Sequence, residues 1–140
     1  MPSEPRDPTA TLRIRVYYED TDAGGVVYYA NYLKYFERAR TEWLRQLGVD
    51  QSQLAKTERR LFVVKSVEIQ YRRPAKLDDE LIIHTDVTRM KRASIQFEQR
   101  ALCRGELLCE ASVTVCCVDA ENFRPVDLGP TVTTLLRSAD

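Results

Sequence analysis

The sequence YYEDTDAGGVVYYANY occupies residues 17–32 and leads directly into a long amphipathic segment. It holds three carboxylates within four residues, Glu19, Asp20 and Asp22, and ionised groups at this density cannot be buried without partners. The pair Gly24-Gly25 breaks regular structure and lets the backbone come close to a ligand. A helix start just beyond it offers unpaired N–H groups and a partial positive charge. The stretch therefore indicates a carboxylate and a polarising amide beside one pocket, which suits attack on a carbonyl carbon.

The segment that follows has the clearest periodicity in the chain. Apolar residues recur at three- and four-residue steps, namely Tyr32, Tyr35, Phe36, Ala39, Trp43 and Leu47. Leu33, Leu44 and the methylenes of Arg40 widen this apolar stripe. Asn31 is the best side-chain N-cap, and Gly48 suits a left-handed C-cap. The pattern predicts a long helix whose apolar face needs a sheet to cover it.

Strand patterns lie on both sides of this helix. Residues 12–18 alternate strictly and place Tyr18 on the apolar face, next to the acidic stretch. Four more strands are predicted over residues 62–71, 80–89, 94–102 and 107–118, and the short turns between them favour an antiparallel meander. Pro74 separates the first two of these strands. One strand, one helix and a run of strands predict a single α+β domain.

Composition narrows the class of protein. The 140 residues suffice for one domain, which we place at residues 11–130, between a flexible arm (1–10) and a C-terminal tail (131–140). Lys plus Arg and Asp plus Glu both number 21, so a nucleic-acid partner is not expected. No apolar run has membrane-spanning length and the first residues do not resemble a secretory signal, which predicts a cytoplasmic protein.

The cysteines predict neither a metal site nor a redox centre. None of the four forms a Cys-x-x-Cys pair, and the chain has a single histidine, His84, to complete a ligand set. We therefore expect small buried cysteines on strands, at positions 103, 109, 116 and 117, and a strand-pairing or surface role for His84.

The motif Tyr-x-Asp-Thr-Asp-x-x-Gly-Val-Val-Tyr-x-x-x-Tyr, from Tyr18 to Tyr32, resembles the opening of the 4-hydroxybenzoyl-CoA thioesterase family. The later run Glu-Arg-Ala-Arg-Thr-Glu, residues 37–42, narrows the resemblance to YbgC-type acyl-CoA thioesterases of the Tol–Pal gene cluster. The resemblance covers nearly all of the chain after residue 10. It implies the hotdog fold, an antiparallel sheet wrapped on one long helix. It also implies an acyl-CoA substrate, no cofactor apart from the coenzyme A of that substrate, and a homodimer or tetramer with interfacial active sites.

The resemblance assigns roles to three residues of the acidic stretch. The resemblance implies that Asp22 is the catalytic carboxylate, either as nucleophile or as general base. Without the resemblance, the residues alone would favour an ordinary turn or N-cap aspartate. The backbone N–H of Tyr29 polarises the thioester carbonyl, although YbgC-type enzymes often carry histidine at this position. Tyr18 either orients Asp22 by a hydrogen bond or is the last core residue of its strand.

A second set of candidates lies at a predicted hairpin turn. Arg89, Lys91, Arg92 and Ser94 match coenzyme A phosphates in charge and donor geometry, and the family places coenzyme A contacts near this turn. Charged hairpin tips are, however, commonly just solvated.

The sequence leaves two functions open. The first is acyl-CoA hydrolysis, and the second is a non-catalytic acyl-CoA-binding or scaffold protein at an envelope or lipid-synthesis assembly. A hydratase of this fold is excluded because it needs a histidine five residues after the carboxylate, where this chain has Val27. Acyl chain length and the choice between dimer and tetramer are not encoded in any local pattern.

Overall fold

The computed structural model describes residues 10–138. In chain order its elements are β1 (Ala10–Arg15), the 3₁₀ turn η1 (Tyr18–Asp20), α1 (Asn31–Gln46), α2 (Gln51–Thr57), β2 (Arg60–Tyr71), β3 (Glu80–Met90), β4 (Ser94–Cys103), β5 (Glu106–Asp119) and α3 (Gly129–Ser138). Of the predicted N-terminal arm, residues 1–9 lie outside the described residues, and Ala10 already belongs to β1.

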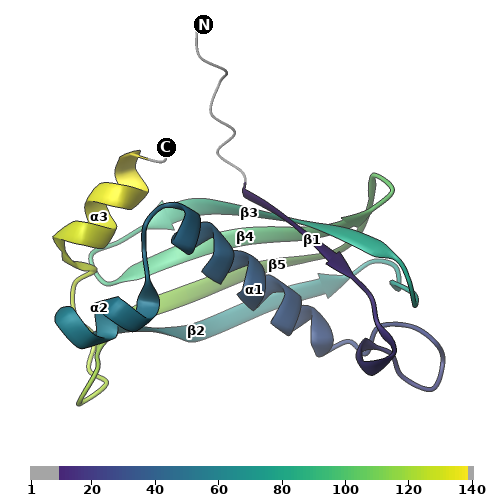
Figure 1. Cartoon of the computed structure of the whole chain (residues 1–140), viewed down its shortest axis with the longest axis horizontal. Coiled ribbons are helices and arrows are strands. Elements are labelled where there is room, and N and C mark those ends of the chain that lie inside the picture. The colour runs from purple at the N-terminus through teal and green to yellow at the C-terminus, as the bar shows by residue number, and fades with distance from the viewer. Residues whose placement is uncertain (1–9, 139–140) are drawn as a thin grey trace, which may run out of the picture.

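The strands form one antiparallel sheet in the order β1-β3-β4-β5-β2, and α1 crosses one of its faces (Figure 1). The predicted α+β architecture, with one long helix against a sheet, is therefore confirmed. β3, β4 and β5 form the predicted meander. The prediction that β2 continues this meander is wrong, because β2 pairs with β5, with Val67 opposite Val113. Alternation tells which face a side chain takes but not which strand lies alongside.

The first strand is shorter than its alternation predicts. β1 ends at Arg15, opposite Glu80, and the backbone N–H of Val16 still donates to the carbonyl oxygen of Asp79 at 2.9 Å. The chain then leaves the sheet and makes the turn η1. The predicted strand end at Tyr18 is thus wrong, since that residue has no neighbouring strand to continue the ladder.

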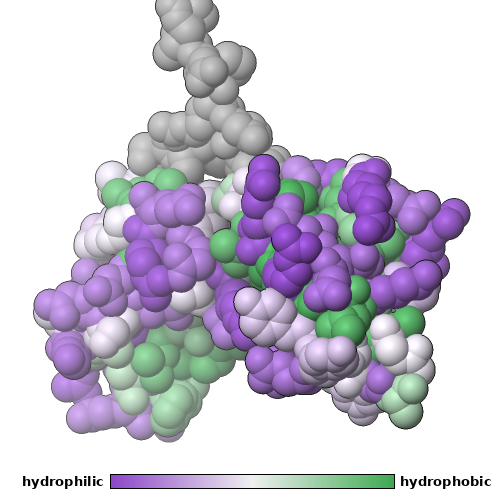
Figure 2. Space-filling view, turned by 45° about the vertical axis from the view of Figure 1, so that its right-hand side comes forward, coloured by the Kyte–Doolittle hydropathy of each residue, from purple (hydrophilic) through white to green (hydrophobic). Residues whose placement is uncertain are grey.

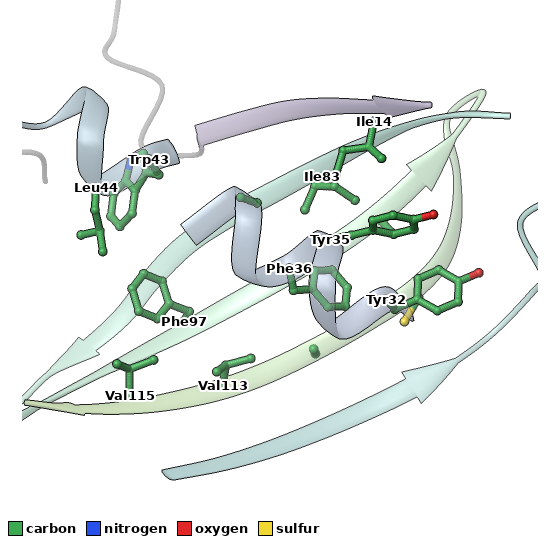
Figure 3. Packing of buried hydrophobic residues seen from close by; sticks show 14 of the residues in the cluster. Ile14, Tyr32, Tyr35, Phe36, Trp43, Leu44, Ile83, Phe97, Val113 and Val115 are labelled. Atoms are coloured by element: carbon green, nitrogen blue, oxygen red, sulfur yellow. The ribbon is translucent and has the colours of Figure 1, made fainter. Parts of the chain in front are cut away.

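The core lies between α1 and the sheet. The predicted stripe of α1 is buried from Tyr32 to Trp43, and the Trp43 ring meets Phe97 of β4 edge-on at 6.0 Å (Figure 3). Leu33, expected to widen the stripe, is instead 42% exposed. Gly48 ends the helix with a φ of 99°, the left-handed conformation predicted for it.

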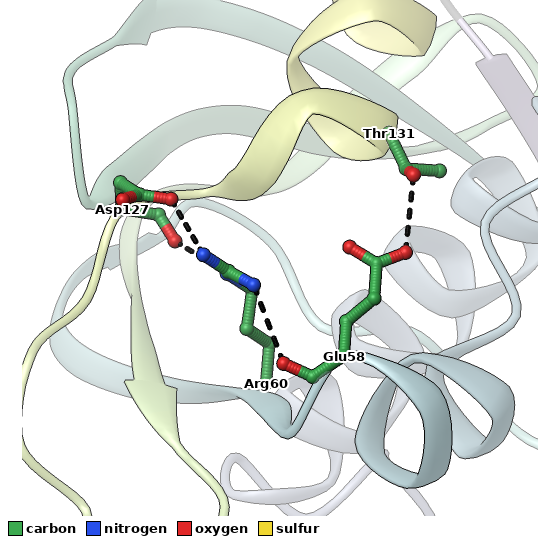
Figure 4. Close-up of polar contacts among 4 residues, drawn as sticks. All are labelled: Glu58, Arg60, Asp127 and Thr131. Atoms are coloured by element: carbon green, nitrogen blue, oxygen red, sulfur yellow. Dashed lines mark hydrogen bonds and ion pairs between the residues drawn. The ribbon is translucent and has the colours of Figure 1, made fainter.

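The C-terminal segment extends the domain beyond the predicted boundary at residue 130. Residues 129–138 form α3, whose Val132 and Leu136 are buried in the same core as α1. Arg60 holds the start of α3 by donating from Nε to the Asp127 carbonyl oxygen at 2.8 Å and from Nη2 to its carboxylate at 2.7 Å (Figure 4). Thr131 donates to the Glu58 carboxylate at 3.0 Å. These contacts tie α3 to the junction of α2 and β2.

This attachment of α3 predicts an acid-sensitive contribution to stability. The hydrogen bond from Arg60 lowers the pKa of Asp127. A lowered folded-state pKa gives stability that is present above the ordinary aspartate pKa and is lost as the pH falls through the folded value. We expect Asp127→Asn to lower Tm at pH 6, and we expect the difference from the wild type to shrink as the pH falls below the ordinary aspartate pKa and through the lowered folded-state pKa. Thermal unfolding across this range measures the effect, with Glu19→Gln, an exposed carboxylate, as control. A difference that persists unchanged into acid would contradict the assignment.

Candidate active site

The acidic stretch folds into a tight hairpin that projects from the end of the sheet. Thr21 bridges Val27, the Asp22 N–H donates to the Val26 carbonyl at 2.9 Å, and the Gly25 N–H donates to the Asp22 carbonyl at 3.0 Å. Gly25 has a φ of 78°, which a side chain would strain. The returning arm is anchored by the Val27 N–H, which donates to the Ala75 carbonyl at 2.8 Å. This anchoring fixes the hairpin beside the segment between β2 and β3.

The two aspartates of the hairpin have different environments. Asp20 accepts from the Tyr17 N–H at 2.9 Å through one oxygen and from the Asn31 side chain at 2.6 Å through the other. Asp22 is exposed and accepts through Oδ1 from the Gly24 N–H at 2.9 Å. Within residues 10–138 its Oδ2 has no hydrogen-bond donor. Asp20 therefore holds the loop together, while Asp22 keeps an oxygen free for chemistry.

Gly24 lies unusually close to this carboxylate. A Cβ at position 24 would stand 3.3 Å from Asp22 Oδ1, closer than ordinary van der Waals contact. A side chain at position 24 would push this carboxylate aside, so glycine favours the close hydrogen bond from the residue-24 N–H. This fixes the side-chain direction of Asp22 without any contribution from a second side chain.

The helix begins two residues after Tyr29. Asn31 is its first residue, and Ala30 occupies the N-cap position without a side-chain cap. Just before the regular helix, the Asn31 N–H donates to the Tyr28 carbonyl and the Tyr32 N–H donates to the Tyr29 carbonyl. The prediction of Asn31 as N-cap is wrong, because its side chain donates to Asp20 instead. In the described chain the Tyr29 N–H donates no hydrogen bond, which leaves it available to a ligand.

An aromatic cluster surrounds this amide. The Tyr71 hydroxyl of β2 donates to the Tyr29 carbonyl oxygen at 3.1 Å, and their rings meet edge-on at 6.0 Å. The rings of Tyr28 and Tyr29 lie 4.8 Å apart. The neighbouring Tyr29 raises the pKa of Tyr28, and the negative charge of Asp22 adds a smaller contribution. The Tyr28 N–H also donates to the Asp20 carbonyl oxygen at 2.9 Å, which ties this cluster to the acidic hairpin.

A cavity of about 270 Å³ lies beside the cluster. Its walls are Val27, Tyr29, Tyr32, Tyr71, Arg72, Arg73 and Pro74. The sequence predicts Tyr71 only as a strand residue. No local pattern indicates that its hydroxyl contacts Tyr29. The hairpin, the free amide and this cavity together could hold and attack an acyl carbonyl.

Tyr18 takes neither of its two predicted places. Its side chain is 80% exposed, so it is not a core residue. Its hydroxyl makes no hydrogen bond to Asp22 in the part of the chain that the structure describes. The reason is the turn η1, which takes Tyr18 out of the β1 alternation and turns it towards solvent.

The predicted phosphate-binding residues lie at the other end of the sheet. β3 begins beside the acidic hairpin and runs for eleven residues, about 33 Å, to the turn with Lys91 and Arg92. There a cavity of about 370 Å³ is lined by both cations and by Arg137 of α3. No pattern in the sequence indicates this role for Arg137. Arg89 is exposed, and Ser94 closes the turn by accepting from the Lys91 N–H at 2.9 Å. A single chain therefore does not bring these cations to Asp22.

Other cations lie nearer to the hairpin. Arg72, Arg73, Lys76 and Arg104 line a wide cavity of about 910 Å³ together with Asp79 and Glu106. Three of these arginines form ion pairs, with Glu110, Glu106 and Asp79 respectively. No pattern in the sequence indicates this group, because its cations come from two separate connections, between β2 and β3 and between β4 and β5.

Among residues 10–138, no group of three or more His, Cys, Asp or Glu side chains could hold a metal ion. No helix in that range is long and apolar enough to cross a membrane. His84 faces Arg100 across the β3–β4 ladder, the strand-pairing role predicted for it.

The sheet wraps on one helix, and a free carboxylate and a free amide lie near an apolar cavity. These features define the class as a hotdog-fold protein whose site suits acyl groups. The family model described as "Thioesterase-like superfamily" matches residues 16–135. "Acyl-CoA thioesterase YbgC" of Haemophilus influenzae is 52% identical over 113 residues, which cover 81% of this chain and 83% of that protein. The chain belongs to the YbgC-type acyl-CoA thioesterase family.

Solved structures agree with this assignment and confirm the hotdog fold. The "Probable Thioesterase from Bartonella henselae" has a TM-score of 0.83 and 38% identity, covering 86% of this chain and 99% of the other. A variant of 4-hydroxybenzoyl CoA thioesterase, complexed with 4-hydroxybenzoyl CoA, has a TM-score of 0.86 at 19% identity, covering 93% and 99%. At that identity the likeness concerns the fold alone.

Proposed function

We propose that this chain hydrolyses acyl-CoA thioesters with Asp22 as the reacting carboxylate and the Tyr29 N–H as the donor to the thioester oxygen. The reaction class is that of its family, an acyl-CoA thioester hydrolase that releases free coenzyme A and a carboxylic acid. The assignment of residues rests chiefly on one observation. Asp22 Oδ2 and the Tyr29 N–H are both without partners in the described chain, beside the same aromatic cluster.

Two routes are open to Asp22. Its free oxygen attacks the carbonyl carbon and expels the coenzyme A thiolate, which takes up a proton, and water then hydrolyses the mixed anhydride. Alternatively the carboxylate removes a proton from a water molecule that attacks the carbonyl. Both routes place negative charge on the thioester oxygen. A preorganised N–H donor at that oxygen contributes about 3 kcal/mol in comparable acyl-transfer sites.

Release of free thiol from short, long and aromatic acyl-CoAs tests the function. We expect saturable hydrolysis of at least one class. An absence of turnover with all of them, combined with tight acyl-CoA binding, would instead favour the binding or scaffold protein. The envelope or lipid-synthesis partners of that alternative stay a prediction.

We also propose a homo-oligomer in which β2 pairs with β2 of a second copy. β2 is a sheet edge of twelve residues, and its Val63, Val64 and Val67 are between 37% and 50% exposed. A long apolar edge invites pairing with another strand. A two-fold axis through the edge reverses the second sheet, so the hairpin end of one subunit approaches the Lys91 end of the other. Pairing of this kind would supply the nucleotide contacts that one chain does not bring to Asp22.

Neutralising the turn cations tests this composite site. We expect the double variant Lys91→Ala, Arg92→Ala to raise KM for acyl-CoA about tenfold at low salt with little change in kcat. The reason is that these charges would bind the nucleotide equally in the ground state and in the transition state. The effect should shrink as salt rises, since exposed charges are screened. The control replaces Lys34 and Arg38, two exposed cations of α1, with alanine. An unchanged KM at low salt would show that the turn cations are solvated and do not bind the nucleotide. Arg72 and Arg73 would then be the next candidates for that contact.

The proposal includes neither metal nor cofactor, and it places the reaction in the cytoplasm. The compartment is supported by four free cysteines. Burial raises the pKa of one of them, Cys109, to about 12. Such a thiol stays protonated and unreactive at neutral pH. Activity that survives dialysis against EDTA is the expected result for a metal-free site.

A further inference from the structure

A further cavity, separate from the three described above, lies under α1. It has a volume of about 250 Å³ and lies between α1 and the strands β2, β4 and β5. Its lining is formed by Glu37, Arg40, Thr41, Leu44, Gln51, Phe62, Val64, Ile95, Phe97 and Val115. One water molecule takes up about 30 Å³, so the cavity exceeds a simple packing defect.

An open apolar strip of β2 leads to this cavity. Phe62, Val64, Val67, Ile69 and Tyr71 lie opposite the core residues of β5, so they share the face on which α1 packs. α1 packs over β1 and β3 and α2 packs on β2, while the middle of the strip stays open, with Val64 50% and Val67 37% exposed. Hydrophobic side chains open to the surface at the lower left of the space-filling view, the side on which Figure 1 places α2 and β2 (Figure 2). The strip starts at Tyr71, which holds Tyr29, and ends at the cavity.

The cavity contains a buried cation that forms no direct ion pair among residues 10–138, although Glu37 also lines the cavity. Arg40 is 9% exposed, and its Nη1 donates to Gln99 Oε1 at 2.9 Å. Gln99 is fully engaged by neutral groups, since its Nε2 donates to the Phe36 carbonyl and to the Thr85 hydroxyl, both at 2.9 Å. Among the described residues no carboxylate lies within ion-pair distance of Arg40.

A buried cation without a direct ion pair is costly. Burial lowers the pKa of Arg40, and the charge of Glu37 partly opposes the shift, yet a guanidinium stays protonated in proteins. Leaving a buried cation unpaired destabilises a protein strongly, whereas a hydrogen-bonded carboxylate compensates it. Four of its five N–H donors remain available beyond the bond to Gln99. The site is therefore suited to an anion that arrives along an apolar path.

We infer that this cavity binds the far end of the acyl group and that Arg40 pairs there with a carboxylate. The preferred substrates would then be mono-CoA thioesters of dicarboxylic acids, with an apolar chain between thioester and carboxylate. Ten residues of helix separate Ala30 from Arg40, a distance of about 15 Å along α1, which suits a chain of medium length. The inference rests on the proposed thioesterase function and specifies its substrate class.

Matched substrates test the charge directly. We compare kcat/KM for adipoyl-, suberoyl- and sebacoyl-CoA with hexanoyl-, octanoyl- and decanoyl-CoA. Arg40→Met should lower kcat/KM for the best dicarboxylic substrate about tenfold or more, the range for a charged hydrogen bond, and change the plain acyl-CoA of equal length less than threefold. Arg40→Lys, which keeps the charge, should recover part of the loss. Arg38→Met, an exposed neighbour on α1, serves as control and should change neither.

Equal losses for both members of a pair would overturn the inference and give Arg40 a structural role. Because Arg40→Met removes a core hydrogen bond and could unfold the chain, a second measurement uses the wild type alone. Titration calorimetry should show monomethyl suberate binding at least tenfold more tightly than methyl octanoate, which has the same chain and ester group but no carboxylate. Methyl octanoate that binds as well as monomethyl suberate defeats the inference. Hydrolysis of plain acyl-CoAs with no preference for the dicarboxylic series defeats it too, while the thioesterase function stands.

Discussion

Asp22→Asn should reduce kcat for acyl-CoA hydrolysis about a thousandfold while leaving the fold and acyl-CoA binding nearly intact. The asparagine keeps the shape of the side chain and can still accept from the Gly24 N–H through its oxygen. It can neither attack a carbonyl as an anion nor remove a proton from water, and such groups contribute about 10²–10⁴-fold. The measurement is kcat at saturating acyl-CoA, with circular dichroism for the fold and calorimetry for binding.

Asp20→Asn is the matched control in the same hairpin. Asp20 accepts two hydrogen bonds that tie Tyr17 and Asn31 to the loop, so its replacement should lower Tm more and kcat less than Asp22→Asn does. Retention of more than about a tenth of wild-type kcat by Asp22→Asn, a barrier change under about 1.4 kcal/mol, would sink the assignment. The reverse ranking of the two variants would make Asp20 the reacting carboxylate.

The second large effect is expected at Tyr29. If its backbone N–H polarises the thioester, Tyr29→Phe and Tyr29→His should both retain most of the activity, because neither removes the amide. Tyr29→Pro removes this N–H and should lower kcat a hundredfold or more, equivalent to the loss of one oxyanion donor. The measurement is again kcat, with circular dichroism to confirm folding.

Ala30→Pro separates the loss of the amide from disturbance of the helix entrance. Ala30 has a φ of −68°, which proline adopts without strain, and its replacement leaves the Tyr29 N–H in place. We expect this variant to be much more active than Tyr29→Pro. Similar losses in both variants would point to the helix entrance, and a hundredfold loss in a well-folded Tyr29→Phe would put the phenol into the mechanism.

The sequence by itself determined the features that depend on neighbours within a turn or along a strand. The α1 stripe from Tyr32 to Trp43 is set by the 3.6-residue period, and Gly48 ends the helix because only its backbone takes a positive φ freely. The acidic stretch likewise predicted a site beside the helix start, whereas the separate roles of Asp20 and Asp22 follow from their hydrogen bonds in the structure.

Interactions between distant segments decided the rest. Alternation in β2 fixed its faces, but pairing with β5 depends on the crossover of residues 72–79, which no local pattern encodes. The same is true of Tyr71 at the Tyr29 carbonyl and of Arg40 over its cavity, where the partners are 42 and 59 residues apart. The helix C-cap and the strand faces follow from short-range sterics and hydrogen bonds. The partners of Tyr71 and Arg40, and the separation of Lys91 from Asp22, follow only from how the whole sheet packs on α1.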